Sequence, residues 1–285
     1  MKVFVLGHQG MLGHVVARYL AQQGCQVTTS TLRYAAQARD PLVETARDSG
    51  CDWIVNCIGR IKQKSDNPAE LFLTNSLLPL HLGLRLRPDQ RLVHASTDCV
   101  FSGRQGHYPV DGEQDAEDIY GLSKAMGEAA ARPRRCVVIR TSIIGPELGG
   151  SHGLMGWLLS QPGEVNGYTN HLWNGITTLE WAKICFELMS GRLKTKDPVV
   201  QPGIEPPMCK CDMLRLMGQI WGSTVKVRPV EAKVAVDRTL VPTLPRPGLE
   251  QQLRELKTWY DTGQPSGALP RTGTRPAART RASNS

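Results

Sequence analysis

Long hydrophobic runs are missing from this sequence of 285 residues. No stretch approaches the roughly 18 uncharged apolar residues that a membrane-spanning helix requires. The first apolar run, residues 2–6, is too short for a secretory signal and leads directly into a glycine-rich segment. We therefore expect a cytoplasmic protein that has no membrane partner.

Closely spaced metal ligands are scarce as well. Of the eight cysteines, only Cys209 and Cys211 form a close pair, and no second pair or histidine cluster completes a zinc site. Most of the other cysteines lie in or beside apolar runs, so in a reducing compartment we expect them to be small hydrophobic side chains. The sequence therefore predicts no metal site.

The chain also lacks patches in which basic residues alternate with aromatic ones, and aromatic residues make up only 6% of it. Its net charge of +8 thus does not indicate a nucleic-acid partner. Half of that charge comes from four arginines in residues 262–285, a segment without acids that is rich in Pro, Gly, Ser, Thr and Ala. This composition predicts a disordered basic tail, and the remaining charge suits anionic ligands.

What the chain does contain is a strand, a glycine-rich turn and a helix at its start. Residues 2–6 are typical of a buried parallel strand, and apolar positions at helical spacing follow from residue 12. Between them, Gly7 permits a tight turn, Gly10 lets the backbone approach a pyrophosphate, and Gly13 allows close contact between helix and strand. The phosphates would lie at the helix N-terminus. The cofactor-binding residues predicted here are Gly7, Gln9, Gly10, Met11, Leu12 and Gly13.

The second predicted strand, residues 26–30, bears on the choice of dinucleotide. NAD sites usually carry an acid at the end of this strand, where it binds the ribose 2′-hydroxyl. Here the segment reads Ser30, Thr31, Leu32 and Arg33, without an acid. Arg33 would accept a 2′-phosphate instead, which favours NADPH over NADH. A solvated loop arginine is the alternative interpretation.

Strands and helices continue to alternate through the first half of the chain. The predicted strands are residues 52–58, 91–96 and 136–140, and the predicted helices are residues 68–87, interrupted by Pro79, and 119–131. This alternation predicts an α/β fold with a doubly wound parallel sheet. Ligands of such sheets bind beyond the carboxyl ends of the strands. Gly7, Asn56, Thr97 and Thr141 each end or follow a strand, so we expect them to gather at one edge.

Tyr120 and Lys124 lie four residues apart within the predicted helix of residues 119–131. This spacing places both side chains on one face of the helix. A free tyrosine has a pKa of about 10, and a nearby ammonium group lowers it by stabilising the phenolate. Thr97, directly after a strand, would hold the oxygen that receives the proton. Together these three side chains suit the reduction of a carbonyl or the oxidation of an alcohol.

Taken in order, these motifs resemble the extended short-chain dehydrogenase/reductases, and among them the dTDP-4-dehydrorhamnose reductase branch. The resemblance implies a Rossmann-type sheet with a smaller C-terminal lobe for substrate. It implies NADPH as cofactor, with NADH as the alternative, and reduction of the C4 keto group of a nucleoside-diphosphate 4-keto-6-deoxyhexose. The resemblance leaves open whether the protein forms a homodimer. The motifs that carry the resemblance are Gly7-x-x-Gly10-x-x-Gly13, Ser96-Thr97-Asp98, Tyr120-Gly121-x-Ser123-Lys124 and Arg140-Thr141.

The same resemblance implies roles for individual residues. Tyr120 would donate the proton, Lys124 would lower its pKa and hold the nicotinamide ribose, and Thr97 would bind the carbonyl oxygen. Cys99 stands where this branch usually has tyrosine, so the sugar itself is not identified. Two further sets of residues would line the ligand sites: Asn56, Cys57 and Ile58 for the cofactor, and Asp98, His152, Trp157, Tyr168 and Trp173 for the sugar nucleotide.

The predicted organisation is a cofactor domain over residues 1–145, a substrate lobe over residues 146–261 that returns to the first domain, and the tail of residues 262–285. Two other functions fit the fold. An epimerase or dehydratase keeps NAD bound, and Asp98 beside Thr97 resembles the acid that dehydratases carry there. A non-catalytic regulatory subunit is the third interpretation. The loss of the tyrosine or the lysine would be a sign of such a protein, and this chain keeps both Tyr120 and Lys124.

Overall fold

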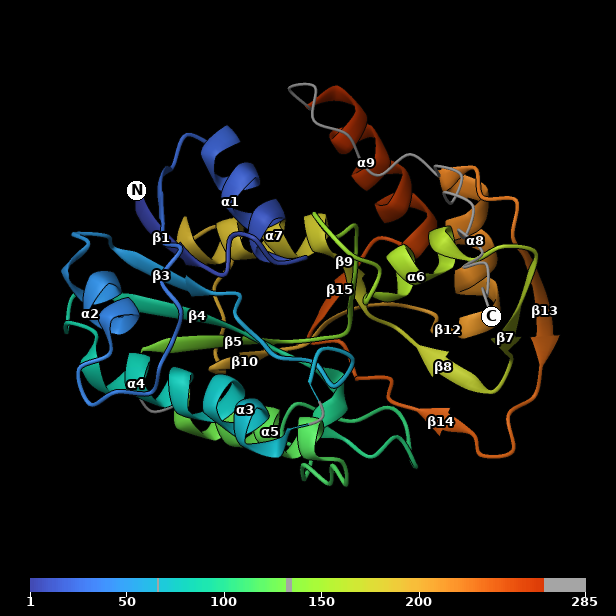
Figure 1. Cartoon of the computed structure of the whole chain (residues 1–285), viewed down its shortest axis with the longest axis horizontal. Helices are drawn as coiled ribbons and strands as arrows, with labels where there is room; N and C mark the ends of the chain where they lie inside the picture. The colour runs from blue at the N-terminus through green and yellow to red at the C-terminus, as the bar shows by residue number, and fades with distance from the viewer. Residues whose placement is uncertain (66, 132–134, 264–285) are drawn as a thin grey trace, which may run out of the picture.

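The computed structural model describes residues 1–65, 67–131 and 135–263, and nearly all of the expected tail lies outside them. The described residues form two lobes, and the first is built on a parallel sheet with the strand order β10-β5-β4-β3-β1-β2 (Figure 1). The strands of this sheet are β1 (Lys2–Leu6), β2 (Gln26–Thr29), β3 (Trp53–Asn56), β4 (Arg91–Ser96), β5 (Cys136–Arg140) and β10 (Val199–Val200).

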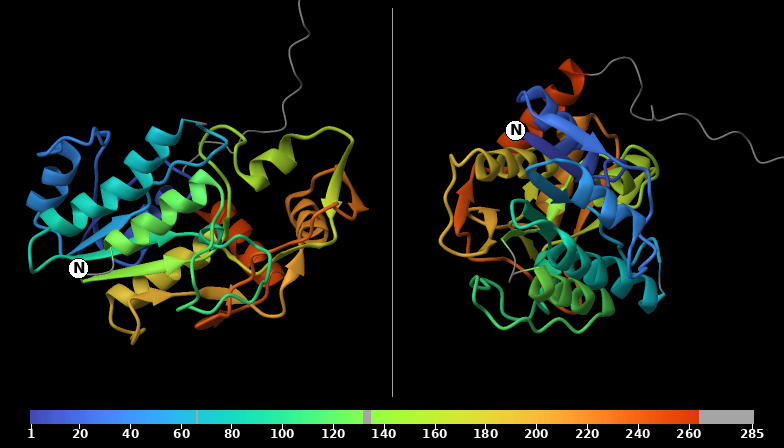
Figure 2. Two further views of the ribbon diagram at one scale, coloured as in Figure 1. Left: turned by 90° about the horizontal axis from the view of Figure 1, so that it is seen from below. Right: turned by 90° about the vertical axis from the view of Figure 1, so that its left-hand side faces the viewer.

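Helices cover both faces of the sheet (Figures 1 and 2). On one face α1 (Gly13–Gln22) lies against α7 (Thr178–Met189), and on the other lie α2 (Pro41–Asp48) and α5 (Ile119–Ala131). The central strands are buried on both sides, which explains why β3 reads as an apolar run without alternation. The doubly wound α/β fold of the Rossmann type is therefore confirmed.

The long helix expected over residues 68–87 is interrupted near Pro79. It divides into α3 (Pro68–Phe72), the π-helical segment η1 (Leu73–Leu77) and α4 (Leu78–Arg85). A proline ring crowds the carbonyl four residues earlier, which here belongs to Asn75. That carbonyl faces Gly127 of α5, where an added Cβ atom would lie 2.1 Å from Asn75 O. The wide turn and the glycine together let η1 lie directly against α5.

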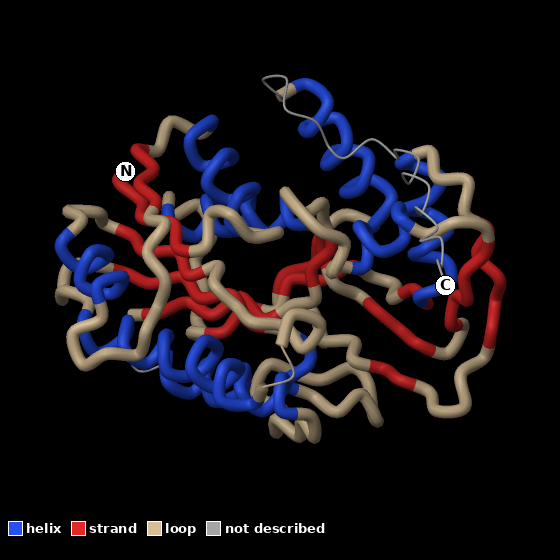
Figure 3. Tube along the Cα trace, in the orientation of Figure 1, coloured by secondary structure: helices blue, strands red, loops and turns tan. Residues whose placement is uncertain are grey.

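The second lobe is made of short strands joined by long loops (Figure 3). Strand β7 pairs with β13, β8 lies between β12 and β14, β11 pairs with β15, and β6 pairs with β9. These strands are β6 (Ile143–Ile144), β7 (Glu164–Tyr168), β8 (His171–Trp173), β9 (Ile176–Thr177), β11 (Pro202–Ile204), β12 (Met208–Cys209), β13 (Lys226–Val230), β14 (Val236–Asp237) and β15 (Leu244–Arg246).

Three helices complete this part of the chain: α6 (Leu154–Ser160), α8 (Lys210–Trp221) and α9 (Leu249–Thr262). One hydrophobic core runs from the α1 face of the sheet, through Trp181 of α7, to Met213 of α8 and Leu253 of α9. The lobes therefore share a core. Strand β10, which follows much of the second lobe in the chain, completes the edge of the first sheet beside β5.

A buried ion pair joins the sheet to the helix that carries Tyr120 and Lys124. Arg140 of β5 and Glu128 of α5 are fully buried and form two hydrogen bonds of 2.9 and 2.6 Å, Nε to Oε1 and Nη2 to Oε2. Arg140 Nη1 also donates to Gln201 Oε1 at 2.8 Å. Gln201 in turn donates to the carbonyl oxygens of Tyr108 and Val241. Because the pair bridges distant segments, it fixes α5 relative to the sheet.

We predict that Glu128→Gln lowers the free energy of unfolding by about 3–5 kcal/mol, because Arg140 would keep a buried charge without its counter-ion. Urea denaturation of the purified variant measures this. The matched control is Arg254→Ala, which breaks the exposed pair with Glu250 on α9 and should cost at most about 0.5 kcal/mol. Equal losses in the two variants would contradict a special role for the buried pair.

Candidate active site

The glycine turn between β1 and α1 has the geometry of a phosphate-binding loop. Gly7 has a φ of 80°, and its carbonyl accepts a hydrogen bond of 2.9 Å from Gly10 N–H. A Cβ atom on Gly13 would lie 2.1 Å from Gly7 O, so only glycine fits there. Among the described residues, Met11 N–H has no hydrogen-bond acceptor and stands free at the start of α1. The turn therefore suits an anionic group such as a dinucleotide phosphate.

The neighbouring turn after β3 borders this loop. Ile58 N lies 3.1 Å from the position of a Cβ atom on Gly7, so the two turns are in contact. The side chain of Asn56 faces the protein interior: its Oδ1 accepts from Ile58 N–H at 3.1 Å, and its Nδ2 contacts His94 Nδ1 at 3.1 Å. At this edge Asn56 thus shapes the turn, while Cys57 and Ile58 lie next to the glycines.

Arg33 is exposed a few residues beyond the end of β2. Strand β2 is the edge strand beside β1, so this arginine lies on the side of the glycine turn that the adenosine half of a dinucleotide would occupy. No acid stands between Thr29 and Arg33.

Thr97, Tyr120 and Lys124 come together at the carboxyl end of β4. The Thr97 side chain lies close enough to the Tyr120 hydroxyl to act on its pKa, and Lys124 Nζ donates to Ala95 O at 2.6 Å. Gly121 makes the approach close, because a Cβ atom there would lie 2.2 Å from Cys99 O. The first turn of α5 can therefore lie directly on the segment after β4.

The electrostatics of this group differ from the sequence prediction. Burial raises the pKa of Tyr120 above its ordinary value, and the neighbouring Cys99 thiol acts in the same direction. Burial also lowers the pKa of Lys124 to about 8, against the opposing effect of Glu128. The pKa of Tyr120 is therefore raised, where the sequence predicted a lowered one, since removal from water outweighs the opposing effect of Thr97. Tyr120 is a neutral phenol at neutral pH, which is the form that donates a proton.

Asp98 lies beside the same group and faces the second lobe. It accepts a hydrogen bond of 3.0 Å from the Thr97 hydroxyl. Burial raises the pKa of Asp98, while the positive charges of Arg238 and Lys210 act against this. Two cations of the second lobe are therefore near enough to act on Asp98, and neither cation was predicted from the sequence. The sequence gives little indication of either residue, because isolated basic residues are common in loops and at the starts of helices.

Asn75 is a further residue at this site that the sequence did not reveal. It is fully buried in η1. Its Oδ1 accepts from Arg60 N–H at 2.8 Å, and its Nδ2 donates to Arg60 O at 2.9 Å and to Ser123 Oγ at 3.0 Å. Asn75 thus ties the segment after β3 to α5, between Tyr120 and Lys124. The interrupted helix around Pro79 was its only sequence signal.

The residues expected to contact a sugar nucleotide are spread over the second lobe. Tyr168 is exposed at the end of β7 and lies 4.6 Å from His171, measured between ring centroids. Trp157 of α6 is half-buried, and His152 is exposed in the loop before that helix. Trp173 is only 4% exposed and belongs to the hydrophobic core, so its ring has little surface for a ligand.

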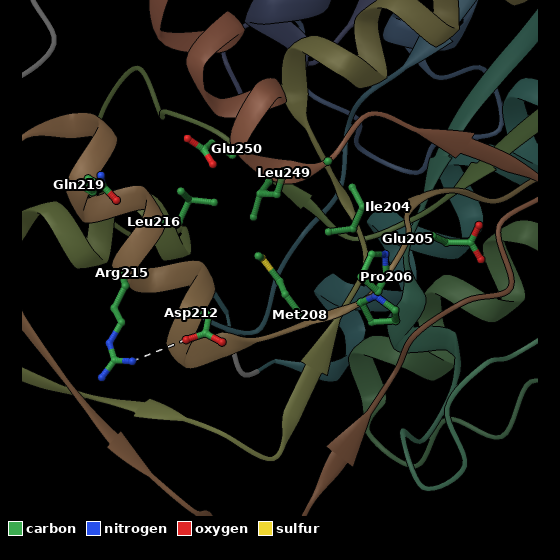
Figure 4. A pocket seen from close by; sticks show the side chains of 12 residues that line it. Ile204, Glu205, Pro206, Met208, Asp212, Arg215, Leu216, Gln219, Leu249 and Glu250 are labelled. Atoms are coloured by element: carbon green, nitrogen blue, oxygen red, sulfur yellow. Dashed lines mark ion pairs between the residues drawn. The ribbon is translucent and has the colours of Figure 1, made fainter.

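Two hollows lie away from these side chains. One, of about 480 Å³, is lined by Ile204, Met208 and residues of α8 and α9, among them Asp212 and Arg215, which form an ion pair of 3.6 Å (Figure 4). The other, of about 430 Å³, is an almost wholly apolar groove on α3, η1, α4 and α5. Neither contains a predicted site residue.

Two kinds of feature are absent from the described residues. No helix in that part of the chain is long and apolar enough to cross a membrane. Within the same ranges, no group of three or more His, Cys, Asp or Glu side chains is placed to hold a metal ion. The cysteines there are free thiols.

Known proteins match about half of this chain in sequence and most of it in structure. The probable low-salt glycan biosynthesis reductase Agl14 of Haloferax volcanii is 29% identical over 175 residues, 55% of this chain and 58% of that protein. The probable dTDP-4,6-dihydroxy-2-methyloxan-3-one 4-ketoreductase of Streptomyces antibioticus is 31% identical over 136 residues, 46% of each chain. The matches thus span about half the length of these curated relatives.

Among solved structures, the dTDP-4-dehydrorhamnose reductase of Bacillus anthracis in complex with NADP has a TM-score of 0.76 at 16% identity, and the match covers 92% of this chain and 99% of that one. This likeness concerns the fold. The model of the RmlD substrate binding domain family matches residues 1–196, well over half of the chain. The protein therefore belongs to the RmlD substrate binding domain family.

Proposed function

We propose that this protein reduces the C4 keto group of a nucleoside-diphosphate 4-keto-6-deoxyhexose with NADPH, in the synthesis of deoxysugar or surface-polysaccharide precursors. The observation that carries the proposal is the meeting of Thr97, Tyr120 and Lys124 at the sheet edge that also holds the glycine turn. Support comes from the reductase names of the relatives and from the NADP bound by a protein of the same fold.

The proposal assigns each group a task. NADPH, when bound along the glycine turn, supplies the hydride for C4. Thr97 and Tyr120 hold the keto oxygen by hydrogen bonds, and Tyr120, which is neutral, donates its proton to that oxygen. Lys124, buried beneath them, supplies positive charge when protonated and so stabilises the phenolate that remains. The charges of Arg238 and Lys210, which act on Asp98, suit an anionic substrate.

One observation favours a second candidate function. The pKa of Asp98 is raised by burial, and a carboxyl group in that position resembles the acid that a dehydratase of this fold carries beside its threonine. Such enzymes return the hydride to the sugar, so their cofactor is recycled. The two functions differ in whether NADPH is consumed in proportion to product.

The direct test of the proposal mixes the purified protein with NADPH or NADH and a panel of dTDP-, UDP- and GDP-linked 4-keto-6-deoxy sugars. Nicotinamide absorbance is followed for each pair. Stoichiometric oxidation with one sugar supports the reductase and identifies substrate and cofactor together. A changed sugar without net oxidation would indicate the epimerase or dehydratase.

We predict that Tyr120→Phe lowers turnover by about 10²–10⁴-fold, because the proton donor is lost while the ring remains. The affinity for NADPH, measured by fluorescence titration, should stay near that of the wild type. Tyr19→Phe removes the hydroxyl of a tyrosine on α1 and is the matched control, with unchanged turnover expected. Full activity in the Tyr120 variant would rule out the assignment.

The value of kcat/KM should fall as the pH rises through about 8, the pKa to which burial lowers Lys124. The charged form stabilises the developing phenolate and exists below this pH, so activity is retained on the acid side and lost on the alkaline side. Glu128, Cys57 and Cys99 face the ammonium group and His94 lies near it. A pH profile of kcat/KM, which reports the free enzyme, tests this. A profile that stays flat to pH 9.5 would contradict it.

Arg33→Ala should raise the KM for NADPH by about tenfold or more and leave that for NADH nearly unchanged, because a charged partner of the 2′-phosphate is removed. Steady-state kinetics with both cofactors measure the ratio. Arg39→Ala, at an exposed position in the same loop, is the control and should change neither value. An unchanged NADPH preference in the Arg33 variant would show that other groups select the cofactor.

A further inference from the structure

The C-terminal end of α9, the last helix of the described chain, contacts side chains along α1, at His14, Arg18 and Gln22. Tyr260, near the end of α9, is only 3% exposed, and its hydroxyl forms a hydrogen bond with His14 Nε2. The other ring nitrogen of His14 lies 2.8 Å from Gly10 O. A chain of contacts thus leads from the C-terminal helix, through one imidazole, to the middle glycine of the phosphate-binding turn.

The protons in this series of hydrogen bonds have a defined arrangement. Gly10 O is a carbonyl and only accepts, so His14 Nδ1 must carry the proton and donate it. In a neutral imidazole the other nitrogen is then an acceptor, and the Tyr260 hydroxyl donates to it. Burial and the nearby charge of Arg18 lower the pKa of His14, which keeps the ring in this neutral form.

The hydrogen bond to Gly10 O also fixes the direction of an N–H group. A peptide unit is planar, so the carbonyl of Gly10 and the N–H of Met11 point in opposite directions within one plane. Met11 N–H is one of the groups just before and at the start of α1 that have no acceptor among the described residues. His14 holds the carbonyl from the helix side and so directs this N–H away from the helix, toward the place where an anion would bind.

Other contacts hold α9 in position over α1. The guanidinium of Arg18 lies 4.1 Å from the centre of the Trp259 ring, and Trp259 Nε1 donates to Gln22 Oε1 at 2.6 Å. Leu253 and Leu256 of α9 are fully buried. Tyr260 is therefore a fixed donor for His14, and the contact does not depend on a mobile side chain.

We propose that Tyr260 and His14 are positioning residues for cofactor binding, which orient the peptide between Gly10 and Met11 so that its N–H meets a dinucleotide phosphate. The proposal rests on the function proposed above only in naming that ligand. Neither residue touches the reacting atoms, so their effect should fall on cofactor affinity and not on turnover.

The test compares Tyr260→Phe, His14→Asn and His14→Leu in the full-length protein. Asparagine keeps a donor at the place of Nδ1, whereas leucine removes both hydrogen bonds. NADPH titration should show affinity weakened about threefold to tenfold in Tyr260→Phe, by a similar amount in His14→Asn, and more in His14→Leu. At saturating NADPH, kcat should stay within about twofold of the wild type. Tyr19→Phe, on α1 but remote from the turn, should match the wild type throughout.

A second measurement does not need a ligand. Amide hydrogen exchange of Gly10 and His14, whose N–H groups close the turn, should be faster in Tyr260→Phe and His14→Leu than in Tyr19→Phe. Faster exchange without NADPH binding even in the wild type would support the positioning role and reject the proposed function. Unchanged exchange in both variants, or equal changes in Tyr19→Phe, would overturn the positioning role.

Discussion

The ion pair between Arg140 and Glu128 is the interaction on which the site depends. A charge in the core is stable only when a partner balances it at close range, so the positions of β5 and α5 are fixed to each other. Helix α5 carries Tyr120 and Lys124, and the strand beside β5, which is β4, ends directly before Thr97. A small rotation of α5 would separate Tyr120 from Thr97. The same arginine holds Gln201, so the segment leading into the second lobe is fixed by the same charge.

Close backbone contacts set the remaining geometry. Gly13 lies against Gly7 O, Gly121 against Cys99 O and Gly127 against Asn75 O, and in each case a Cβ atom would lie about 2 Å from the oxygen. The first contact forms the phosphate-binding turn, and the other two bring α5 onto the end of β4 and onto η1. The site is therefore built from main-chain atoms in contact, and its side chains are carried into place by them.

Much of the first lobe could be predicted from the sequence, because its elements are long and continuous. The strand at residues 136–140 and the helix at residues 119–131 have the expected bounds. The second lobe could not be predicted in this way. Segment 241–247 contains three prolines, yet it includes β15, which exists through its pairing with β11. Pairings of two or three residues depend on distant partners and leave little local pattern.

The residues of the site could likewise be predicted only in part. Tyr120, Lys124 and Thr97 could be found from spacing and strand ends, but the pKa of Tyr120 depends on how many atoms surround its hydroxyl. Asn75 could not be found, because its contacts join segments far apart in the chain. Trp173 was expected at the substrate, yet its ring completes the core. An aromatic residue can contact a ligand or complete a hydrophobic core, and only its surroundings in the fold distinguish these two roles.

The return of the chain to the first sheet at β10 has a consequence for synthesis on the ribosome. Until Val199 and Val200 have emerged, the outer edge of β5 has no neighbour, and its backbone N–H and C=O groups are open to pairing with another chain. The nascent first lobe thus carries an unfinished edge while about fifty further residues are translated after Ile144. A chain interrupted in this interval would be the form most prone to aggregate, and its Rossmann sheet becomes complete only when the second lobe is already partly made.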